Sequence, residues 1–465
     1  MTVKKRIAVI GGGISGLSAL HFIKYRYADS CDVKLYEKES RLGGTIGTDR
    51  TDGFVSDWGP NGFLDKVPLT LRLVSELGLD ELLDPAKPSA EKRFIYRNKK
   101  LHEIHASPPK FMRSQILTLA GRLRLVMEPL VPQKKDDSDE SIFDFGKRRI
   151  GRDAAEHMIV PMVSGIYGGD ARKLSLKACF PIMVEMEREY GSLFKALLAR
   201  KKAGSKGGPA GPAGRLTSFK NGLYTLIETM HEKYRNHIVT GRGVKKISYA
   251  DNIYTLEFES GGPENFDAVI CAAPAYAATG MVSVMNEELS RVLASIPYSS
   301  IAVVCSGYKK EDVAHDLAGF GFLIPRDQNV RILGSIWTSS IFSGSAPDGM
   351  VQFRTMIGGA TDPQAAALSD GELADIAHRE LNDILGLSAQ PGYLKIFKWS
   401  QGIPQFTIGH PERMEHLNKI LDKYPGLQFA GNSYKGVSLN DCIVRSDEVV
   451  GAIAGQFNLQ VEKKS

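Results

Sequence analysis

A glycine-rich turn near the start of the chain limits its fold more than any other feature. The apolar run Ile7–Ile10 leads into Gly11-Gly12-Gly13-Ile14-Ser15-Gly16, which has G-x-G-x-x-G spacing, and then into the helix-like segment Leu17–Leu20. A second apolar run, Val33–Tyr36, ends on Glu37, about twenty residues after the last glycine. This order of strand, turn, helix, strand and acid is typical of a Rossmann-like β-α-β unit that binds a dinucleotide.

Each part of the turn has a chemical reason. Gly11 permits the tight turn, Gly13 lets the backbone approach a pyrophosphate, and Gly16 lets the helix pack close to the strand. The helix N-terminus offers N–H groups and a partial positive charge to phosphates. Glu37 would accept hydrogen bonds from a ribose 2′-hydroxyl, which argues against a 2′-phosphate there. The alternative is a structural glycine turn without a ligand.

Length and composition bound the other possibilities. A chain of 465 residues can bury a large core and divide into two or three domains. The net charge of +6 fits an acidic substrate or an anionic membrane surface without requiring either. We expect no transmembrane helix and no signal peptide, and five scattered cysteines favour reduced thiols in the cytoplasm. We expect no metal site and no nucleic-acid partner.

Two further glycine motifs extend the predicted nucleotide site. Arg41-Leu42-Gly43-Gly44-Thr45 would bring a second backbone segment against the dinucleotide, and Arg41 would add a cation near the diphosphate. Near the other end of the chain, an apolar strand enters a glycine turn and then a helix at 442–454. Backbone N–H groups from Val437 to Leu439 would there face an electron-rich group. Since these motifs lie far apart in sequence, we expect a discontinuous cofactor domain.

The motifs resemble those of the FAD-dependent amine oxidase and protoporphyrinogen oxidase superfamily. Over nearly its whole length the chain is similar to the oxygen-dependent protoporphyrinogen oxidase family of haem biosynthesis. The more particular matching stretches are Ser164–Asp170 with Cys179–Pro181, Gly319–Pro325 and Gly431–Cys442. Lys435 and Cys442 depart from a simple match, because some amine oxidases use a lysine near the flavin or a cysteine that tethers it.

The resemblance implies the six-electron oxidation of protoporphyrinogen IX to protoporphyrin IX. One non-covalent FAD per chain would accept hydride at N5, molecular oxygen would reoxidise it, and hydrogen peroxide would be released. No catalytic acid or base is assigned. The alternatives are coproporphyrinogen III oxidation, which would need more cations, an amine oxidase or carotenoid desaturase, and a non-catalytic flavoprotein. We also expect product handover to ferrochelatase, and a monomer or homodimer that is cytoplasmic or peripheral on the cytoplasmic membrane.

The resemblance also implies which residues touch each ligand. The FAD contacts are Gly11, Gly12, Gly13, Ile14, Ser15, Gly16, Glu37, Lys38, Thr45, Gly59, Pro60, Asn61, Gly62, Val244, Trp399, Val437, Ser438 and Leu439. The substrate contacts are Arg93, Gly165, Phe320, Leu323 and Met356. Arg93 would pair with a propionate, and the other side chains would form an apolar wall for the macrocycle. Without the resemblance, Arg93 could form a surface salt bridge and the apolar side chains could be ordinary core.

We expect an α/β fold in three parts. The FAD-binding domain, with a Rossmann-like parallel sheet, takes residues 1–70, 215–295 and 405–465. The substrate domain, with a mixed sheet, takes residues 71–105, 175–214 and 296–404. The helical domain takes residues 106–174.

Local patterns add detail to this division. Residues 142–163 have a helical pattern, and residues 201–215, rich in Gly, Pro and Ala, are predicted to form a loop. Residues 108–127 alternate apolar and basic side chains at helical spacing. The face so formed could dock on a membrane surface, or it could only pack on the substrate domain.

Overall fold

A five-stranded parallel sheet forms the centre of the nucleotide-binding part. The computed structural model describes residues 4–105, 108–202 and 214–461. In spatial order the sheet contains β10 (Ile238–Val239), β2 (Cys31–Tyr36), β1 (Lys5–Ile10), β14 (Ala268–Cys271) and β20 (Leu427–Phe429). Because its strands come from the beginning, middle and end of the sequence, the predicted discontinuous Rossmann-like sheet is confirmed.

Both faces of this sheet are buried, which explains the continuous apolar run in β1. Ile7 and Val9 point into one core, whereas Ala8 and Ile10 point into another. The first core is shared with α1 (Ile14–Arg26), α2 (Pro68–Glu76), α11 (Tyr224–Tyr234) and α17 (Leu439–Gln456). The second is covered by β11 (Val244–Ala250), β12 (Ile253–Phe258), β13 (Glu264–Phe266), α12 (Ala275–Val282), α13 (Glu287–Ala294) and α16 (His410–Leu421).

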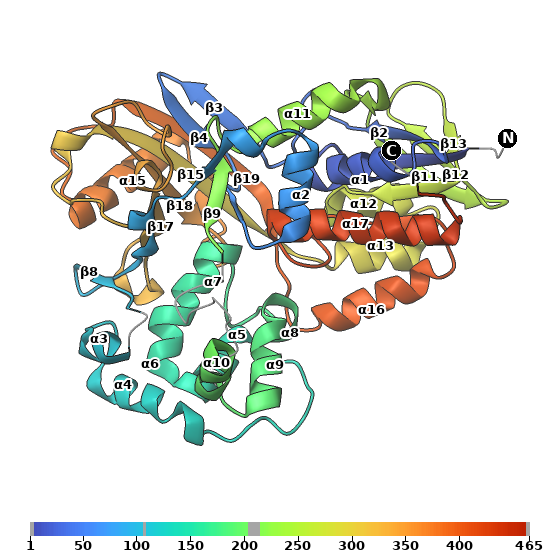
Figure 1. Cartoon of the computed structure of the whole chain (residues 1–465). Helices are drawn as coiled ribbons and strands as arrows, with labels where there is room; N and C mark the ends of the chain where they lie inside the picture. Colours follow the sequence, from blue (N-terminus) through green and yellow to red (C-terminus); the bar gives the residue numbers. More distant parts are fainter. Residues whose placement is uncertain (1–3, 106–107, 203–213, 462–465) are drawn as a thin grey trace.

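A seven-stranded mixed sheet forms the second part, on the left of Figure 1. Its strands, in spatial order, are β19 (Tyr393–Pro404), β15 (Tyr298–Lys309), β18 (Met350–Gly358), β17 (Ile332–Trp337), β16 (Gly321–Leu323), β7 (Phe94–Arg97) and β8 (Lys100–Glu103). Only the β16–β7 pair is parallel within this sheet. The sequence therefore predicted the mixed character of the sheet correctly.

The two faces of the large sheet have different partners. One face packs on α15 (Asp370–Leu385), and β18 contributes Phe353 and Ile357 to that core. Strand alternation turns Arg354 and Met356 to the opposite face. We call this opposite face the inner face, defined by Ile301, Leu323, Arg354, Met356 and Trp399, which the strand registers place on the same side of the sheet.

Short elements join the two parts. They are the hairpin β3 (Thr48–Thr51) and β4 (Phe54–Asp57), the three-stranded sheet of β5 (Phe63–Leu64), β9 (Leu216–Phe219) and β6 (Leu83–Pro85), and α14 (Thr338–Ile341). The hairpin contacts the large sheet, because Gln352 of β18 donates to Ser56 Oγ at 2.7 Å and Tyr393 of β19 donates to the same oxygen at 2.8 Å.

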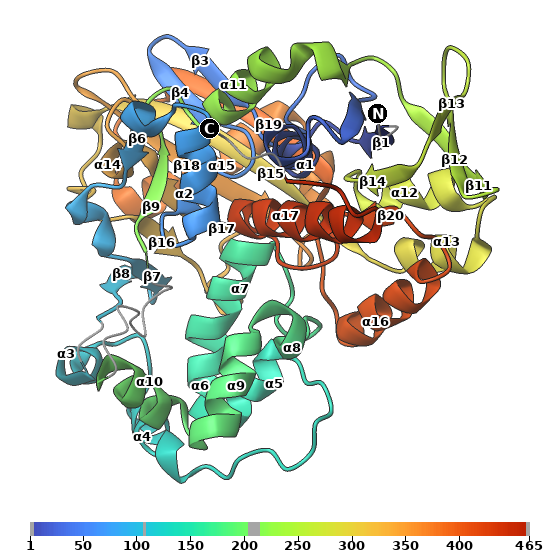
Figure 2. The same cartoon turned by 45° about the vertical axis from the view of Figure 1, so that its right-hand side comes forward.

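A helical group lies below both sheet-containing parts in Figures 1 and 2. Its helices are α3 (Pro108–Arg113), α4 (Leu119–Val126), α5 (Ile142–Ile150), α6 (Arg152–Ala154), a π-helical turn (Ala155–Ile159), α7 (Val160–Tyr167), α8 (Leu176–Cys179), α9 (Pro181–Tyr190) and α10 (Leu193–Lys202). The buried Arg149 bonds Glu128 and lies 3.3 Å from Glu187, so α9 is tied to α5. The three-domain division stays a prediction, and we propose moving α9 and α10 into its helical part.

The helical segments are more broken than the sequence pattern predicted. The expected helix at 142–163 is interrupted at Gly151, whose φ of 90° ends α5. The segment 108–127 forms α3 and α4, separated before Thr118, whose hydroxyl caps α4 by accepting from Gly121 N at 3.0 Å. Most of the predicted loop at 201–215 lies outside the described residues.

Candidate functional site

The glycine turn between β1 and α1 leaves space only where a ligand is expected. A Cβ on Gly16 would lie 1.9 Å from the carbonyl oxygen of Gly11, and one on Gly12 would lie 2.4 Å from Leu42 Cδ2. A Cβ on Gly13 would meet no atom within 4 Å. Gly13 is also the N-cap of α1, and no side chain caps that end. The uncapped N–H groups of α1 and the open space beside Gly13 therefore lie together, as phosphate binding requires.

Glu37 lies at the end of β2 beside this turn. Its carboxylate accepts from Gly12 N at 2.6 Å and from Glu39 N at 2.9 Å, which fixes both oxygens and leaves further lone pairs for a hydroxyl donor. The backbone of Arg242 donates to the Glu37 carbonyl at 3.0 Å, so the segment before Val244 lies next to it. The structure thus brings Glu37 and the Val244 segment together, while the Lys38 side chain points largely into solvent.

The guanidinium of Arg41 contacts the second glycine segment itself, and its place near a diphosphate stays a prediction. Its guanidinium donates to the carbonyls of Leu42, Gly44 and Ile46 at 2.8, 2.6 and 2.9 Å. It also lies 4.6 Å from the centroid of the Trp58 ring. These contacts shape the glycine loop, and Gly43 N in turn donates to the Gly12 carbonyl at 2.8 Å. Arg41 therefore holds the second glycine segment against the first.

The segment Trp58–Gly62 lies between this loop and the inner face. A Cβ on Gly59 would be 2.3 Å from the Thr45 carbonyl oxygen, which shows how closely the two segments pack. Trp399 of β19 donates through Nε1 to the Trp58 carbonyl at 3.3 Å. The close packing thus gathers Thr45, Trp399 and the 59–62 segment, all predicted FAD contacts.

Three buried donors around this segment have no partner. They are Trp58 Nε1, Asn61 Nδ2 and Arg354 Nε. Arg354 lies within the same cluster, because its Nη2 donates to the Gly59 carbonyl. Since unpartnered buried donors are costly, the cluster fits a ligand rich in hydrogen-bond acceptors, such as a flavin ring.

The second helix N-terminus is only partly available. Ser438 caps α17 and its N–H donates to Asp441 Oδ2 at 3.0 Å, so one of the three predicted backbone donors, Val437 to Leu439, is already used. Cys442 follows in the first turn, is 6% exposed, and burial raises the pKa of its thiol to about 11. A thiol of this kind stays protonated and is a poor nucleophile for tethering a flavin.

The predicted substrate contacts form neighbouring pairs along the large sheet. The Arg93 guanidinium lies 5.3 Å from the centroid of the Phe320 ring, and burial lowers its pKa. A Cβ on Gly165 of α7 would be 2.7 Å from Leu323 Cδ2, so α7 packs directly on β16. Met356 belongs to a buried cluster with Ile301 and Leu333, against which Trp399 packs. Gly334 of β17 pairs with both Leu323 and Met356, so these pairs lie next to each other across the sheet, between the helical group and the predicted FAD segment.

Sequence reasoning missed Arg354 and Gln352, which hold the hairpin segment on the sheet. Both lie in the stretch Val351-Gln-Phe-Arg-Thr-Met, whose first four residues alternate apolar and polar side chains. The signal was available, since a charged residue inside a buried strand needs a partner or a role. The direction in which its side chain points, however, depends on pairing with β15 and β17.

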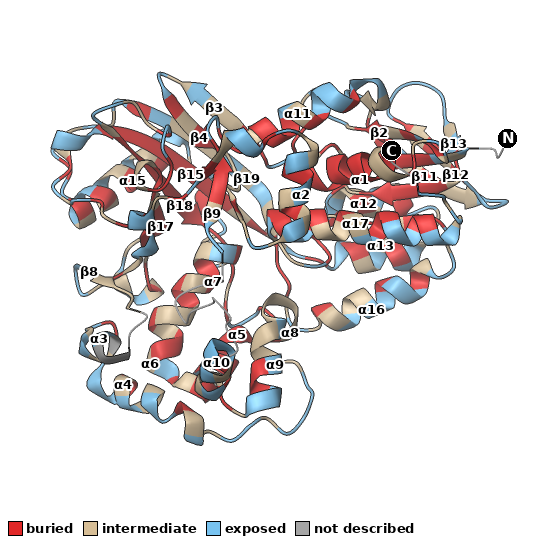
Figure 3. Ribbon diagram, in the orientation of Figure 1, coloured by how far each residue is buried: buried red, intermediate tan, exposed pale blue. Residues whose placement is uncertain are grey.

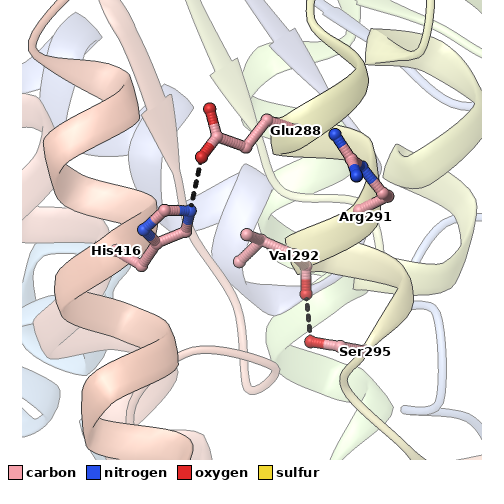
Figure 4. A pocket seen from close by; sticks show the side chains of 5 residues that line it. All are labelled: Glu288, Arg291, Val292, Ser295 and His416. Carbon is pink, nitrogen blue, oxygen red and sulfur yellow. Dashed lines mark hydrogen bonds and ion pairs between the residues drawn. The ribbon is translucent and has the colours of Figure 1, made fainter.

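Other regions offer little chemistry. A surface pocket of about 370 Å³ lies between α13 and α16, where His416 Nε2 lies 2.9 Å from Glu288 Oε1, but none of the predicted site residues line it (Figure 4). Residues 4–105, 108–202 and 214–461 contain no cluster of three or more His, Cys, Asp or Glu suited to a metal. In the same ranges, no helix combines the length and apolar character needed to cross a membrane.

Comparisons with known proteins agree with this geometry. Residues 14–453 match the family model described as flavin containing amine oxidoreductase. The chain is 31% identical to coproporphyrinogen III oxidase of Bacillus subtilis (strain 168), with 95% of this chain and 96% of that protein covered. It is 30% identical to chloroplastic protoporphyrinogen oxidase 1 of Arabidopsis thaliana, covering 95% and 86%. The crystal structure of a provisionally named protoporphyrinogen oxidase from Exiguobacterium sp. 255-15 superposes with a TM-score of 0.84, at 26% identity, over 98% and 100% of the two chains.

Proposed function

This chain belongs to the flavin containing amine oxidoreductase family, and from that premise we propose that it binds FAD and oxidises a porphyrinogen to the porphyrin in haem biosynthesis. The observation that carries the proposal is the continuity of the inner face. An arginine on an aromatic ring, an apolar wall and the 58–62 segment follow one another there. Relatives across almost the full length of the chain are named for porphyrinogen oxidation.

The residues of the nucleotide site fit non-covalent FAD. Gly13 and the uncapped start of α1 would receive the diphosphate, and Glu37 would receive a ribose hydroxyl. The unpartnered donors near Gly59 would bond the ring. FAD, when bound, would accept two electrons from the substrate and pass them to oxygen. The buried, protonated Cys442 supports a non-covalent complex.

The inner face fits a large apolar macrocycle with a carboxylate edge. Leu323 and Met356 would contact the ring, and Phe320 would offer an aromatic surface beside it. Arg93 would bond one propionate in a partly desolvated place, which orients the macrocycle towards the 58–62 segment. We assign no acid or base among these side chains, so binding and orientation are their roles.

Protoporphyrinogen IX is the substrate expected from the sequence, and coproporphyrinogen III is a second candidate. The second is favoured by the name of the Bacillus subtilis relative and by two more cations beside the apolar cluster against which Phe320 packs. Ala86 packs in the same apolar cluster as Phe320, Arg215 donates to the Ala86 carbonyl, and Lys87 follows Ala86 in the chain. A substrate with four propionates would use more such cations than one with two.

Aerobic turnover tests the proposed function. Purified flavin-loaded protein is mixed with protoporphyrinogen IX, with coproporphyrinogen III or with a primary amine, and porphyrin fluorescence and hydrogen peroxide are followed. Oxidation of either porphyrinogen with release of peroxide supports the proposal, and the ratio of kcat/KM values selects the substrate. Turnover of the amine alone, or a purified protein that takes up no flavin, refutes it.

The exposed face of α4 completes the proposal. Five large apolar side chains on and just after α4 are more than half exposed; they are Leu119, Leu123 and Val126 of the helix, and Met127 and Leu130 after it. Figure 3 shows this edge of the helical group in the colours of intermediate and exposed residues. With basic Arg113 and Lys110 nearby on α3, this face suits an anionic membrane surface. We propose a cytoplasmic monomer or homodimer that docks there and passes its product to a ferrochelatase.

A further inference from the structure

Arg354 places a buried positive charge at the centre of the inner face. It lies in the middle of β18, paired across the sheet with Cys305 of β15 and Ile336 of β17. Only 7% of the residue is exposed. Because a guanidinium loses much of its hydration in such a place, it needs compensation from groups around it.

The contacts of Arg354 join the two parts of the proposed site. Its Nη2 donates to the carbonyl of Gly59, in the segment that we propose touches the flavin. Two residues further along the same strand, and on the same face, lies Met356 of the proposed substrate wall. Gln352, two residues before, donates to Ser56 Oγ at 2.7 Å. Arg354 therefore sits where the flavin segment meets the substrate wall.

The compensation available from the protein is incomplete. Arg354 Nε has no hydrogen-bond partner, and in the described part of the chain no carboxylate lies within ion-pair distance of the guanidinium. Asp57 attracts it at longer range, while burial lowers the pKa of Arg354 and raises that of Asp57. The unpartnered donors of Trp58 and Asn61 lie in the adjacent segment. A bound ligand with hydrogen-bond acceptors could satisfy all three donors, and negative charge on it would compensate the Arg354 guanidinium.

We propose that the charge of Arg354 favours the reduced form of the bound flavin. Two electrons and one proton taken up by the neutral ring leave it with one negative charge, and a fixed cation beside it stabilises that product. Under the proposed function, the porphyrinogen is the reductant. This inference rests on that proposed function for the position of the flavin. The hydrogen bond to Gly59 keeps the charge in a fixed place relative to the flavin segment.

The midpoint potential of the flavin separates this role from a structural one. Arg354→Gln keeps a donor for the Gly59 carbonyl and removes the charge, whereas Arg354→Lys keeps the charge and loses the planar fork. Arg331→Gln is the matched control, because Arg331 directly precedes β17 of the same sheet and pairs with Asp362 at 2.7 Å. Potentials are measured on the flavin-loaded proteins with an enzymatic reductant and a reference dye, without porphyrinogen.

We expect Arg354→Gln to lower the equilibrium constant for two-electron reduction by about tenfold, which is about 30 mV for such a couple. Arg354→Lys should retain most of the wild-type value, and Arg331→Gln should match wild type. An unchanged potential in flavin-loaded Arg354→Gln overturns the proposal, as does an equal fall in the Gln and Lys variants. If Arg354→Gln retains no flavin, Arg354→Lys decides: a potential near wild type supports the charge, and a tenfold fall overturns it.

Two further results keep this inference distinct from the proposed function. Loss of porphyrin affinity in Arg354→Gln at an unchanged potential would assign the charge to a substrate carboxylate, and so overturn the inference. Failure of the wild-type protein to oxidise porphyrinogens would refute the proposed function alone, because the potentials are measured without that substrate.

Discussion

The guanidinium of Arg93 lies 5.3 Å from the centroid of the Phe320 ring, although the two residues are far apart in sequence. The main chain fixes this contact, because the Phe320 N–H donates to the carbonyl of Lys92 at 2.8 Å. The parallel pairing of β7 with β16 continues the same alignment. A cation and an aromatic face are thus held together before any substrate binds.

Arg93→Ala should weaken substrate binding more than turnover. A charged hydrogen bond to a propionate contributes on the order of 1.5–3 kcal/mol. We therefore expect KM for the porphyrinogen to rise by roughly tenfold to a hundredfold, with a smaller change in kcat. Arg93→Lys should recover only part of this loss, since lysine keeps the charge without the fork. Steady-state kinetics on the three proteins provide the comparison.

Esterified substrate is the control for that experiment. A porphyrinogen methyl ester has no carboxylate, so wild type and Arg93→Ala should oxidise it about equally poorly. The acid and ester on both proteins form a complete thermodynamic cycle. If the mutation costs the acid no more than it costs the ester, Arg93 does not anchor a propionate.

Phe320→Ala should lower kcat/KM for the porphyrinogen by roughly tenfold without loss of flavin, because the aromatic surface belongs to the substrate wall. Flavin content per chain and turnover are measured together. Tyr276→Ala, at a 41% exposed aromatic on α12, provides the control with unchanged values. Normal turnover in Phe320→Ala would place this ring in the core instead.

Gly13→Val should mainly block flavin binding, whereas Gly16→Ala should mainly destabilise the fold. A side chain at Gly13 meets no protein atom within 4 Å of its Cβ, so the apoprotein should lose about 1 kcal/mol or less while flavin binding is blocked. A Cβ at Gly16 would lie 1.9 Å from the Gly11 carbonyl oxygen and should destabilise the apoprotein by about 1–3 kcal/mol. Urea unfolding and flavin content separate the two effects. Full flavin occupancy in Gly13→Val would show that the turn does not bind the diphosphate.

Leu123→Glu should weaken binding to vesicles that contain anionic lipid. The side chain is 56% exposed on α4, and a carboxylate there opposes both burial in lipid and the negative surface. Leu198→Glu, at a 61% exposed position on α10, is the control. Co-sedimentation should fall several-fold for the first variant alone. Equal binding by wild type and Leu123→Glu would mean that α4 does not dock on lipid.

The sequence predicted features that depend on local backbone requirements. The turn at Gly11–Gly16 could be identified because its glycines meet local requirements: a Cβ on Gly12 or Gly16 would overlap a nearby atom, whereas one on Gly13 would enter open space. The acid at Glu37 follows from the length of one β-α-β unit. The place of Arg354 could not be identified in this way. Its burial depends on the register of β18 with two other strands. The carbonyl partners of Arg41 could not be predicted either, because the folded loop brings them together.

Anaerobic titration of the flavin-loaded protein with porphyrinogen tests the central claim most directly. Each porphyrinogen yields six electrons on full oxidation and each flavin takes two, so one porphyrin should appear for every three flavins bleached, with full colour returning in air. The account predicts this ratio for protoporphyrinogen IX or coproporphyrinogen III. A flavin that remains oxidised in the presence of both porphyrinogens would contradict it.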